Sequence, residues 1–241
     1  MIRYLAKLTA RGALSVEAQS ALLALPGKTE TVEHYRDLVR EGEPARRCCL
    51  VVEGLVSRYK TLRSGGRQIL SFHIPGDMVD LTSCLLKFVD YGIRTHVPTT
   101  VQTYDHDDIL RLAAQYPDLG RSLWFDTLVD GAIFREWTVN VGRRSGRQRI
   151  AHLLLEFAHR LRRIGQSDGE TFTLSVTQTD LADAVGLSPV HVNRSLQALR
   201  SDGLIRTMGR TVTLLDPARL ADEADFNDLY LHPEGPRQLR G

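Results

Sequence analysis

Short apolar runs separated by glycine or proline turns dominate the first part of the chain. Between residues 29 and 107 the clearest runs are CCLVVEG, LVSRYKTL, RQILSFHI and TTVQTYDH, with breaks at Gly54, Gly65-Gly66 and Pro75-Gly76. Runs of this length, spaced by turn residues, are typical of β-strands. The pattern predicts a small antiparallel β-roll, which is jelly-roll-like, preceded by a helix over residues 15–25.

Beyond residue 107 the apolar positions take a helical period. A short helix is expected over 107–116, and Pro117 opens a long one over 118–142. The apolar load of the long helix means that it packs on its own domain or pairs with a second copy of itself, although Asp130 interrupts the heptad. We interpret it as a dimerisation helix, with contacts through Leu123, Phe134, Trp137 and Val141.

A basic break follows the long helix. Gly142 ends the helical pattern, Arg143-Arg144-Ser145-Gly146 forms a hinge, and Ser145 can cap a new helix that ends at Gly165. The predicted organisation is therefore a β-roll sensor or regulatory domain over 1–116, a dimerisation helix over 117–142, and a DNA-binding domain with an acidic tail over 143–241. The predicted fold class is α+β.

The stretch VTQTDLADAVGLSPVHVNRSLQALRSDGLI has the signals of two capped helices joined by a tight turn. Thr177 is a good N-cap with Asp180 three residues later, Gly186 allows the turn, and Ser188-Pro189 begin a second helix. Val192, Leu196 and Leu199 form its buried stripe. A hairpin is expected around Met208-Gly209-Arg210. Helix, turn, helix and hairpin together predict a winged helix-turn-helix.

The second helix would enter the major groove of double-stranded DNA. Arg194 can donate two hydrogen bonds to guanine, Asn193 can pair with adenine, and Val190 can contact a thymine methyl group. His191, at the start of the same helix, can serve a base edge or a phosphate. The remaining candidates, expected at the helix starts and on the wing, are Thr177, Gln178, Ser188 and Arg210.

Charge supports a phosphate-facing segment. The net charge of the 241 residues is only +2, but residues 143–215 hold eleven Arg and six acidic residues. From Asp216 onward there are six acidic residues and three Arg. A basic segment between neutral and acidic ones is typical of a nucleic-acid-binding module.

Val176–Leu199 resembles the helix-turn-helix signature of the Crp/Fnr family of bacterial transcription regulators. The matching positions are Thr177, Leu181-Ala182, Val185-Gly186, Ser188, Asn193-Arg194, Leu196 and Leu199. LVREGEPARRCCLVVEGLVSRYKTLRSGGRQILSFHIPGDMVDL resembles the family's β-roll, and RRSGRQRIAHLLLEFAHRL its hinge helix. The resemblance implies a homodimer on a two-fold symmetric operator that recruits or blocks RNA polymerase. In many members a cytosine-reading Glu stands where this chain has Val190, so a different half-site is expected.

The departures from the family bear on the signal. Members that bind cyclic AMP carry Gly-Glu and Arg-Ser pairs, whereas this chain has Met78-Val79-Asp80-Leu81 and Gly92-Ile93-Arg94-Thr95. No cysteine precedes Cys48, so the N-terminal iron–sulfur sensor is not expected. For haem the candidate ligands are His34, His73, His96 and His106, which we expect to be structural or solvated. We therefore expect no cyclic nucleotide, haem or iron–sulfur cluster, and leave open an unidentified small-molecule effector.

The three cysteines favour a reduced, structural role. Cys48, Cys49 and Cys84 form no CxxC and no Cys/His ligand spacing, so no metal site is expected. Cys48 and Cys49 are interpreted as small apolar residues of a strand, and redox activity of the three stays an open question. No nucleophile-elbow, phosphate-loop or zinc-protease motif occurs, so no enzyme is expected.

Two alternatives remain at this point. One is a cupin-like β-barrel that binds a metal or small molecule, although no HxH pair occurs. The other is a ligand-binding module whose winged helix contacts protein rather than DNA. No apolar run approaches the length of a membrane span and no secretory signal opens the chain, so we expect a cytoplasmic protein without membrane contact. The operator, the regulon and the choice between activation and repression lie beyond these patterns.

Overall fold

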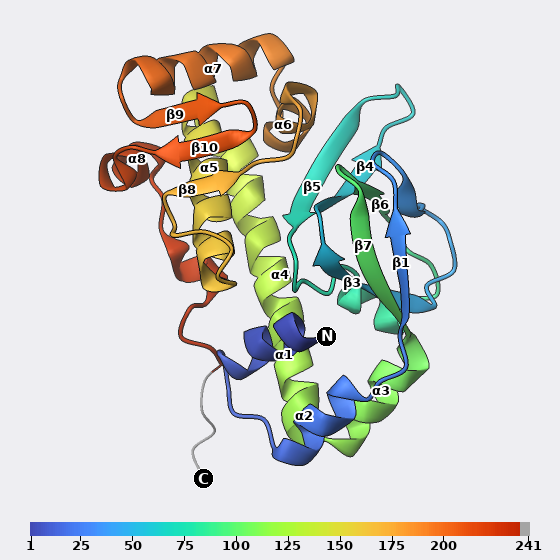
Figure 1. Cartoon of the computed structure of the whole chain (residues 1–241). Coiled ribbons are helices and arrows are strands. Elements are labelled where there is room, and N and C mark those ends of the chain that lie inside the picture. Colours follow the sequence, from blue (N-terminus) through green and yellow to red (C-terminus); the bar gives the residue numbers. More distant parts are fainter. Residues whose placement is uncertain (237–241) are drawn as a thin grey trace. The chain divides into compact units, whose positions relative to one another are not determined.

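The computed structural model describes residues 1–236 as two compact units (Figure 1). The first unit holds Met1–Arg58, Phe72–Ala132 and, of the described residues, 231–236. The second holds Tyr59–Ser71 and Ile133–Tyr230. The end of the predicted acidic tail, residues 237–241, lies outside the described residues.

An antiparallel β-roll forms most of the first unit, although Tyr59–Ser71, which includes parts of two of its strands, belongs to the second unit. One sheet has the order β1-β7-β3, and the other has the order β2-β6-β4-β5. The four runs singled out in the sequence form β3, β4, β5 and β7, which confirms those predictions. The strands are β1 (Lys28–Val32), β2 (Asp37–Val39), β3 (Arg47–Glu53), β4 (Val56–Thr61), β5 (Arg67–His73), β6 (Gly92–Thr95) and β7 (Thr99–Asp105).

Short helices close one end of the roll around an apolar core. They are α1 (Ile2–Thr9), α2 (Val16–Leu23), the 3₁₀ helix η1 (Leu81–Leu85) and α3 (His106–Gln115). Tyr4, Leu50, Tyr104 and Leu119 are fully buried in this core. Burying side chains of this size contributes about 2 kcal/mol each, which is why a roll of short strands is stable.

The long helix α4 (Pro117–Arg143) is continuous over 27 residues. Asp126 of α4 receives ion pairs from Lys7 and Arg11, with N–O distances of 2.9 and 2.6 Å, and these fasten α1 to it. Asp130, which interrupts the predicted heptad, pairs with the buried Arg58 of β4 at 2.8 Å. The two carboxylates that interrupt the apolar stripe of α4 therefore form ion pairs with other residues of the first unit.

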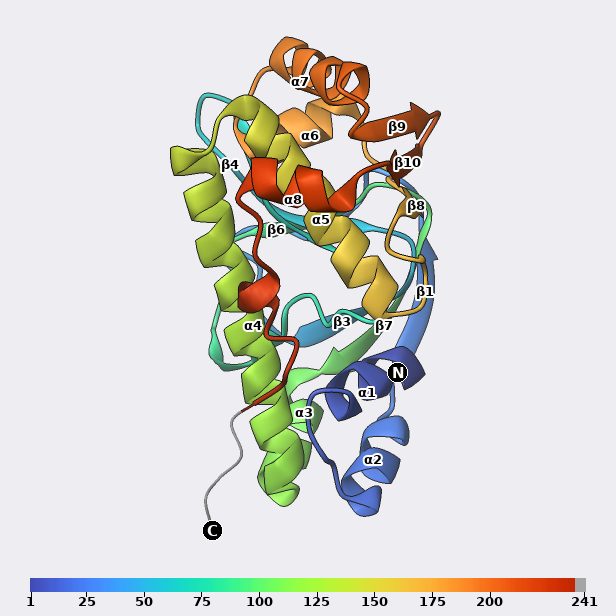
Figure 2. The ribbon, with the colours of Figure 1, turned by 90° about the vertical axis from the view of Figure 1, so that its left-hand side faces the viewer.

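The second unit contains the predicted winged helix-turn-helix. Its helices are α5 (Gly146–Arg163), α6 (Gln178–Val185), α7 (Pro189–Ser201) and α8 (Pro217–Ala224). Its strands β8 (Thr171–Thr173), β9 (Ile205–Met208) and β10 (Thr211–Leu214) form a sheet of order β8-β10-β9. Figure 2 shows α8 beside α5. The α+β fold class, with its roll, long helix and winged helix, is confirmed.

Some elements had no clear signal in the sequence. Strands β1, β2, β6 and β8 are short or mostly polar, and α1 begins at the second residue. The stretch after Asp216 was interpreted as an acidic tail, but it begins with α8, whose Leu220 and Ala224 are fully buried. Glu223 of α8 is ion-paired with Arg147 of α5, so part of the acidic charge is used inside the unit. Within residues 1–236, no helix combines the length and apolarity needed to cross a bilayer.

Candidate nucleic-acid interface

A reciprocal cap fixes the start of α6. The Thr177 hydroxyl accepts from the Asp180 amide at 3.1 Å, and the Asp180 carboxylate accepts from the Thr177 amide at 3.0 Å. The same hydroxyl donates to Asp180 at 2.7 Å. The Thr177 side chain is therefore used in the cap, whereas Gln178 is exposed. The first amides of a helix have no acceptor within the helix, which suits them to an anion.

The turn between α6 and α7 needs a glycine. Gly186 is the C-cap of α6 with φ of +64°, in the left-handed region that L side chains rarely adopt. A Cβ at this position would also lie 3.1 Å from a methyl group of Val141. The predicted tight turn is therefore confirmed, and it sets the angle at which α7 leaves α6.

A buried stripe holds α7 while its other faces stay exposed. Ser188 caps the helix and Pro189 is its first residue, as the sequence predicts. Val192, Leu196 and Leu199 are buried against the unit. The outward positions of α7, at one edge of the unit in Figure 1, include Val190, His191, Asn193 and Arg194, all of them exposed.

Three hydrogen bonds organise this exposed face. Asn193 Nδ2 donates to Gln178 Oε1 at 3.4 Å, which links α7 to the start of α6. The Ser188 hydroxyl lies 3.1 Å from His191 Nδ1 and accepts from the His191 amide at 3.3 Å. Val190, with a side chain 68% exposed, offers only an apolar surface. Arg194 follows Asn193 in the chain and is exposed as well.

The hairpin supplies the wing. Gly209, with φ of +60°, closes the turn between β9 and β10, and Arg210 next to it is exposed. Arg200 of α7 donates to the Thr207 hydroxyl of β9 at 2.6 Å, which joins α7 to the wing. All eight predicted DNA-binding residues thus lie on the exposed surface of this unit.

Supporting contacts to α6 come from residues that the sequence patterns did not single out. Arg67, at the start of β5, donates to Asp180 and Asp183, both at 2.8 Å. Arg149 of α5 donates to the Val185 carbonyl at 3.0 Å and thereby satisfies the last turn of α6. Asp180 therefore serves both the cap and an ion pair with a residue 113 positions away.

The residues predicted for dimerisation lie in different environments. Leu123 belongs to the core of the first unit, and Trp137 is buried in the second, where its indole N–H donates to Glu156 at 2.9 Å. Phe134 is 37% exposed and Val141 half-buried. The exposed apolar side chains of α4 are those of Trp124, Leu128, Phe134 and Val139.

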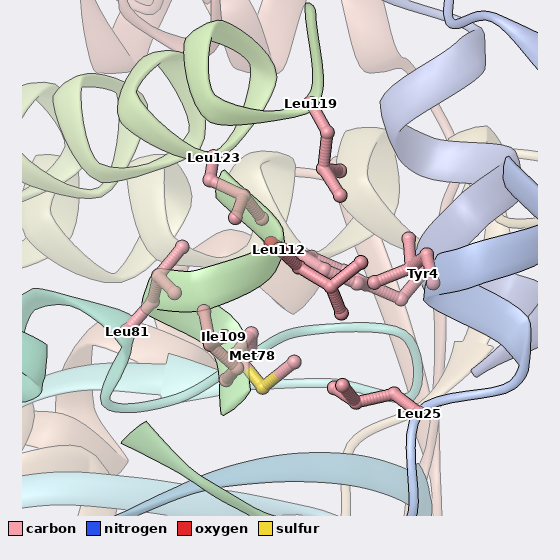
Figure 3. A pocket seen from close by; sticks show the side chains of 9 residues that line it. Tyr4, Leu25, Met78, Leu81, Ile109, Leu112, Leu119 and Leu123 are labelled. Atoms are coloured by element: carbon pink, nitrogen blue, oxygen red, sulfur yellow. The ribbon is translucent and has the colours of Figure 1, made fainter. Parts of the chain in front are cut away.

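The first unit contains a small apolar cavity. Side chains from α1, α2, α3, α4 and the loop after β5 converge on it (Figure 3). The cavity volume is about 10 Å³, room for about one water molecule. The lining residues are Tyr4, Leu22, Leu25, Met78, Leu81, Ile109, Leu112, Leu119 and Leu123.

The positions compared with cyclic-AMP-binding members are engaged in internal contacts. Arg94 of β6 donates to both carboxylate oxygens of Asp37, at 2.8 and 3.2 Å. Thr95 is fully buried, and its hydroxyl donates to the Glu33 carbonyl at 2.6 Å. Both side chains thus hold β6 to the segment that includes β2.

The capped helix pair, the buried stripe of α7 and the adjoining wing define a DNA-binding protein of the winged helix-turn-helix class. Two family models match: a Crp-like helix-turn-helix domain over residues 148–223 and a cyclic nucleotide-binding domain over residues 31–116. Nitrogen fixation regulation protein FixK of Bradyrhizobium diazoefficiens is 31% identical over 171 residues, which is 70% of each chain. The chain belongs to the Crp/Fnr family of transcription regulators.

Other relatives agree over a longer stretch. Transcriptional activator protein FnrL of Cereibacter sphaeroides is 29% identical over 205 residues, covering 81% of this chain and 82% of that one. The structure of FixK2 from Bradyrhizobium japonicum has a TM-score of 0.76 at 27% identity, with 82% of this chain and 97% of that chain covered. The chain is therefore a DNA-binding transcription regulator of this type.

Proposed function

We propose that the protein acts as a homodimer on a two-fold symmetric operator and controls RNA polymerase there, in the cytoplasm. Symmetry requires each α7 to read one half-site, with half-site centres about 34 Å apart, one turn of DNA. The exposed apolar side chains of α4, headed by Trp124 and Leu128, support a pairing of two long helices.

One observation carries the proposal: Asn193 and Arg194 are exposed on a helix whose opposite stripe is fully anchored. Such a helix presents an amide, which can donate to and accept from an adenine, beside a guanidinium, which can donate twice to a guanine. Val190 supplies no hydrogen bond, so the adjacent base pair would be read through apolar contact, for which a thymine methyl is the complement.

We propose that the signal changes the angle between the DNA-binding units at the break between α4 and α5. The break is short, because α4 ends at Arg143 and α5 begins at Gly146. Arg144 spans it by pairing with Glu136 at 2.7 Å and donating to the Ala224 carbonyl at 3.0 Å. A shift at this residue would move α8 and α5 together. The chemistry of the effector stays open.

Selection of binding sites from random duplex DNA tests the proposal. We expect an inverted repeat with centres one helical turn apart, bound by two chains, with affinity that falls steeply as salt rises. Enrichment of no sequence, or of a single unrepeated half-site bound by one chain, would contradict the two-fold mode. A weak salt dependence would argue against contact with several phosphates.

A further inference from the structure

Three metal-ligating side chains meet in the first unit although they are distant in sequence. Cys48 lies in β3, Cys84 in η1, and His106 is the first residue of α3. One possible ligand atom from each lies within 4.8 Å of the other two. Two sulfurs and an imidazole nitrogen are the ligands that soft and borderline metals select over Mg²⁺ or Ca²⁺.

The separation of the two sulfurs fits a shared ion better than a bond between them. Their Sγ atoms are 3.2 Å apart. Two thiolates on one tetrahedral ion lie roughly 3.7 Å apart, as follows from Zn–S bonds of about 2.3 Å, whereas a disulfide needs about 2.05 Å. An ion therefore requires the sulfurs to open by about half an ångström, and a disulfide requires them to close by more than one.

The surroundings resemble the outer shell of a built site. The Ser83 hydroxyl lies 3.4 Å from His106 Nε2 and donates to the Asp80 carbonyl at 2.7 Å. The His106 amide donates to the Arg46 carbonyl at 3.0 Å and so anchors the start of α3 beside β3. Outer contacts of this kind orient a ligand before an ion arrives.

Burial gives the cluster a closed side and an open side. Cys48 is fully buried in the apolar core, and His106 is 5% exposed. Cys84 is partly exposed and therefore lies nearest to solvent. An ion can reach the cluster from that side, while the core behind Cys48 excludes water and strengthens the thiolate bonds.

We propose that Cys48, Cys84 and His106 form a binding site for a thiophilic closed-shell cation, Zn²⁺ or Cu⁺. Neither an N-terminal cysteine group nor the DNA-binding surface takes part in it. Since the three ligands come from β3, η1 and α3, an ion would cross-link the end of the roll to the helix that leads into α4. Zn²⁺ would complete its tetrahedron with water, whereas Cu⁺ is satisfied by three ligands.

Anaerobic titration of the reduced, chelator-treated full-length chain tests the site, with Co²⁺ as a coloured stand-in for Zn²⁺ and Cu⁺ in a separate arm. We expect one ion per chain with thiolate charge-transfer absorption. Cys84→Ser and His106→Gln should each weaken binding by at least tenfold to a hundredfold. Cys49→Ala is the matched control, because Cys49 is the neighbouring cysteine of the same strand and lies outside the cluster. It should bind as tightly as the wild type.

The two arms identify the ion, because a site for Zn²⁺ saturates with Co²⁺ and a site for Cu⁺ only with Cu⁺. Circular dichroism of each variant establishes that it is folded. Failure of both ions to bind stoichiometrically, or undiminished binding by folded Cys84→Ser, would overturn the proposal. A product lighter by two hydrogen atoms after mild oxidation, together with no ion binding, would likewise overturn it and assign the pair to disulfide chemistry.

Discussion

Arg58 of β4 and Asp130 of α4 form a buried ion pair, with 2.8 Å between Nη1 and Oδ2. The side chain of Arg58 is 5% exposed and that of Asp130 is 23% exposed. Arg58 also donates to the Val79 carbonyl and lies 4.7 Å from the Tyr91 ring centroid. Arg58 thus connects β4, the loop after β5 and α4 within the first unit.

Removing Asp130 should be costly. Asp130→Ala leaves the Arg58 guanidinium buried without its counter-charge, so we expect the free energy of unfolding to fall by about 3 kcal/mol. Urea denaturation measures it. Arg111→Ala is the control, because it breaks an exposed pair with Asp108 and should cost less than about 1 kcal/mol. Arg58→Met combined with Asp130→Leu should recover most of the loss, since no buried charge is then left alone. A loss as small as that of the control would contradict a structural role.

Arg194 should carry sequence preference. We expect Arg194→Ala to lower affinity for the selected operator by about tenfold to a hundredfold, while binding to unrelated DNA falls much less. Competition binding with specific and random duplexes separates the two effects. Arg163→Ala is the control, because it removes an exposed arginine near the end of α5 rather than on α7. It should leave the ratio of affinities for specific and random duplexes unchanged. Equal losses on both duplexes would assign Arg194 to phosphates instead.

Arg210 should behave in the opposite way. Its place at the tip of the wing suits a phosphate contact, so Arg210→Ala should weaken binding to specific and random duplexes by a similar factor. The slope of log affinity against log salt should also become shallower by about one. Titrations at several salt concentrations measure that slope. A lost base preference with an unchanged slope would place Arg210 in a groove.

The predictability of the site differs with the distance between interacting residues. Thr177, Gly186 and Ser188 could be predicted because a cap or turn depends on residues three or four positions away. The Arg67–Asp180 pair could not, since its partners are 113 positions apart. Asp130 was noted only as a break in a heptad, because the pattern of one helix carries no information about a strand that packs against it.

The cysteines illustrate the same limit. Metal motifs are recognised in sequence by close spacing, and neither CxxC nor a nearby His accompanies Cys48 or Cys84. Their meeting depends on the way η1 folds back against β3 and on the register that brings Asp105 opposite Arg47 just before His106. The sequence expectation of no metal site depends on spacing along the chain, and spacing does not show which distant cysteines and histidines the fold brings together.

Trp124 should matter for assembly. Trp124 is 67% exposed on α4, and a charge there would be buried if two long helices pair through this face. We expect Trp124→Glu to raise the dimer dissociation constant at least thirtyfold, measured by light scattering or sedimentation. Val16→Glu, at an equally exposed apolar position of α2, should leave assembly unchanged. Trp137→Glu should instead destabilise the second unit, because Trp137 is buried against Glu156. A Trp124→Glu dimer as tight as the wild type would exclude this face of the helix.

His152 should make stability depend on pH. It is fully buried between Phe226 and Tyr230, and burial, followed by the positive charge of Arg144, lowers its pKa to about 3. Glu136 Oε1 lies 3.2 Å from Nε2 without the geometry of a hydrogen bond, and its charge is already paired with Arg144. Burial and the positive charge of Arg144 therefore lower the pKa of His152, and the charge of Glu136 does not reverse this shift.

Since an unfolded histidine has a pKa of about 6.5, the unfolded chain binds the extra proton between that pH and about 3. The free energy of unfolding should therefore fall with acidification, by about 2 kcal/mol between pH 7 and pH 5 from this group alone. His152→Phe should remove this part of the pH dependence. Urea unfolding at several pH values between 7 and 5 measures it. Phe157→Leu, a nearby core change without a titratable group, should lower stability equally at every pH. Parallel curves for His152→Phe and the wild type would show that folding leaves the pKa of His152 unchanged.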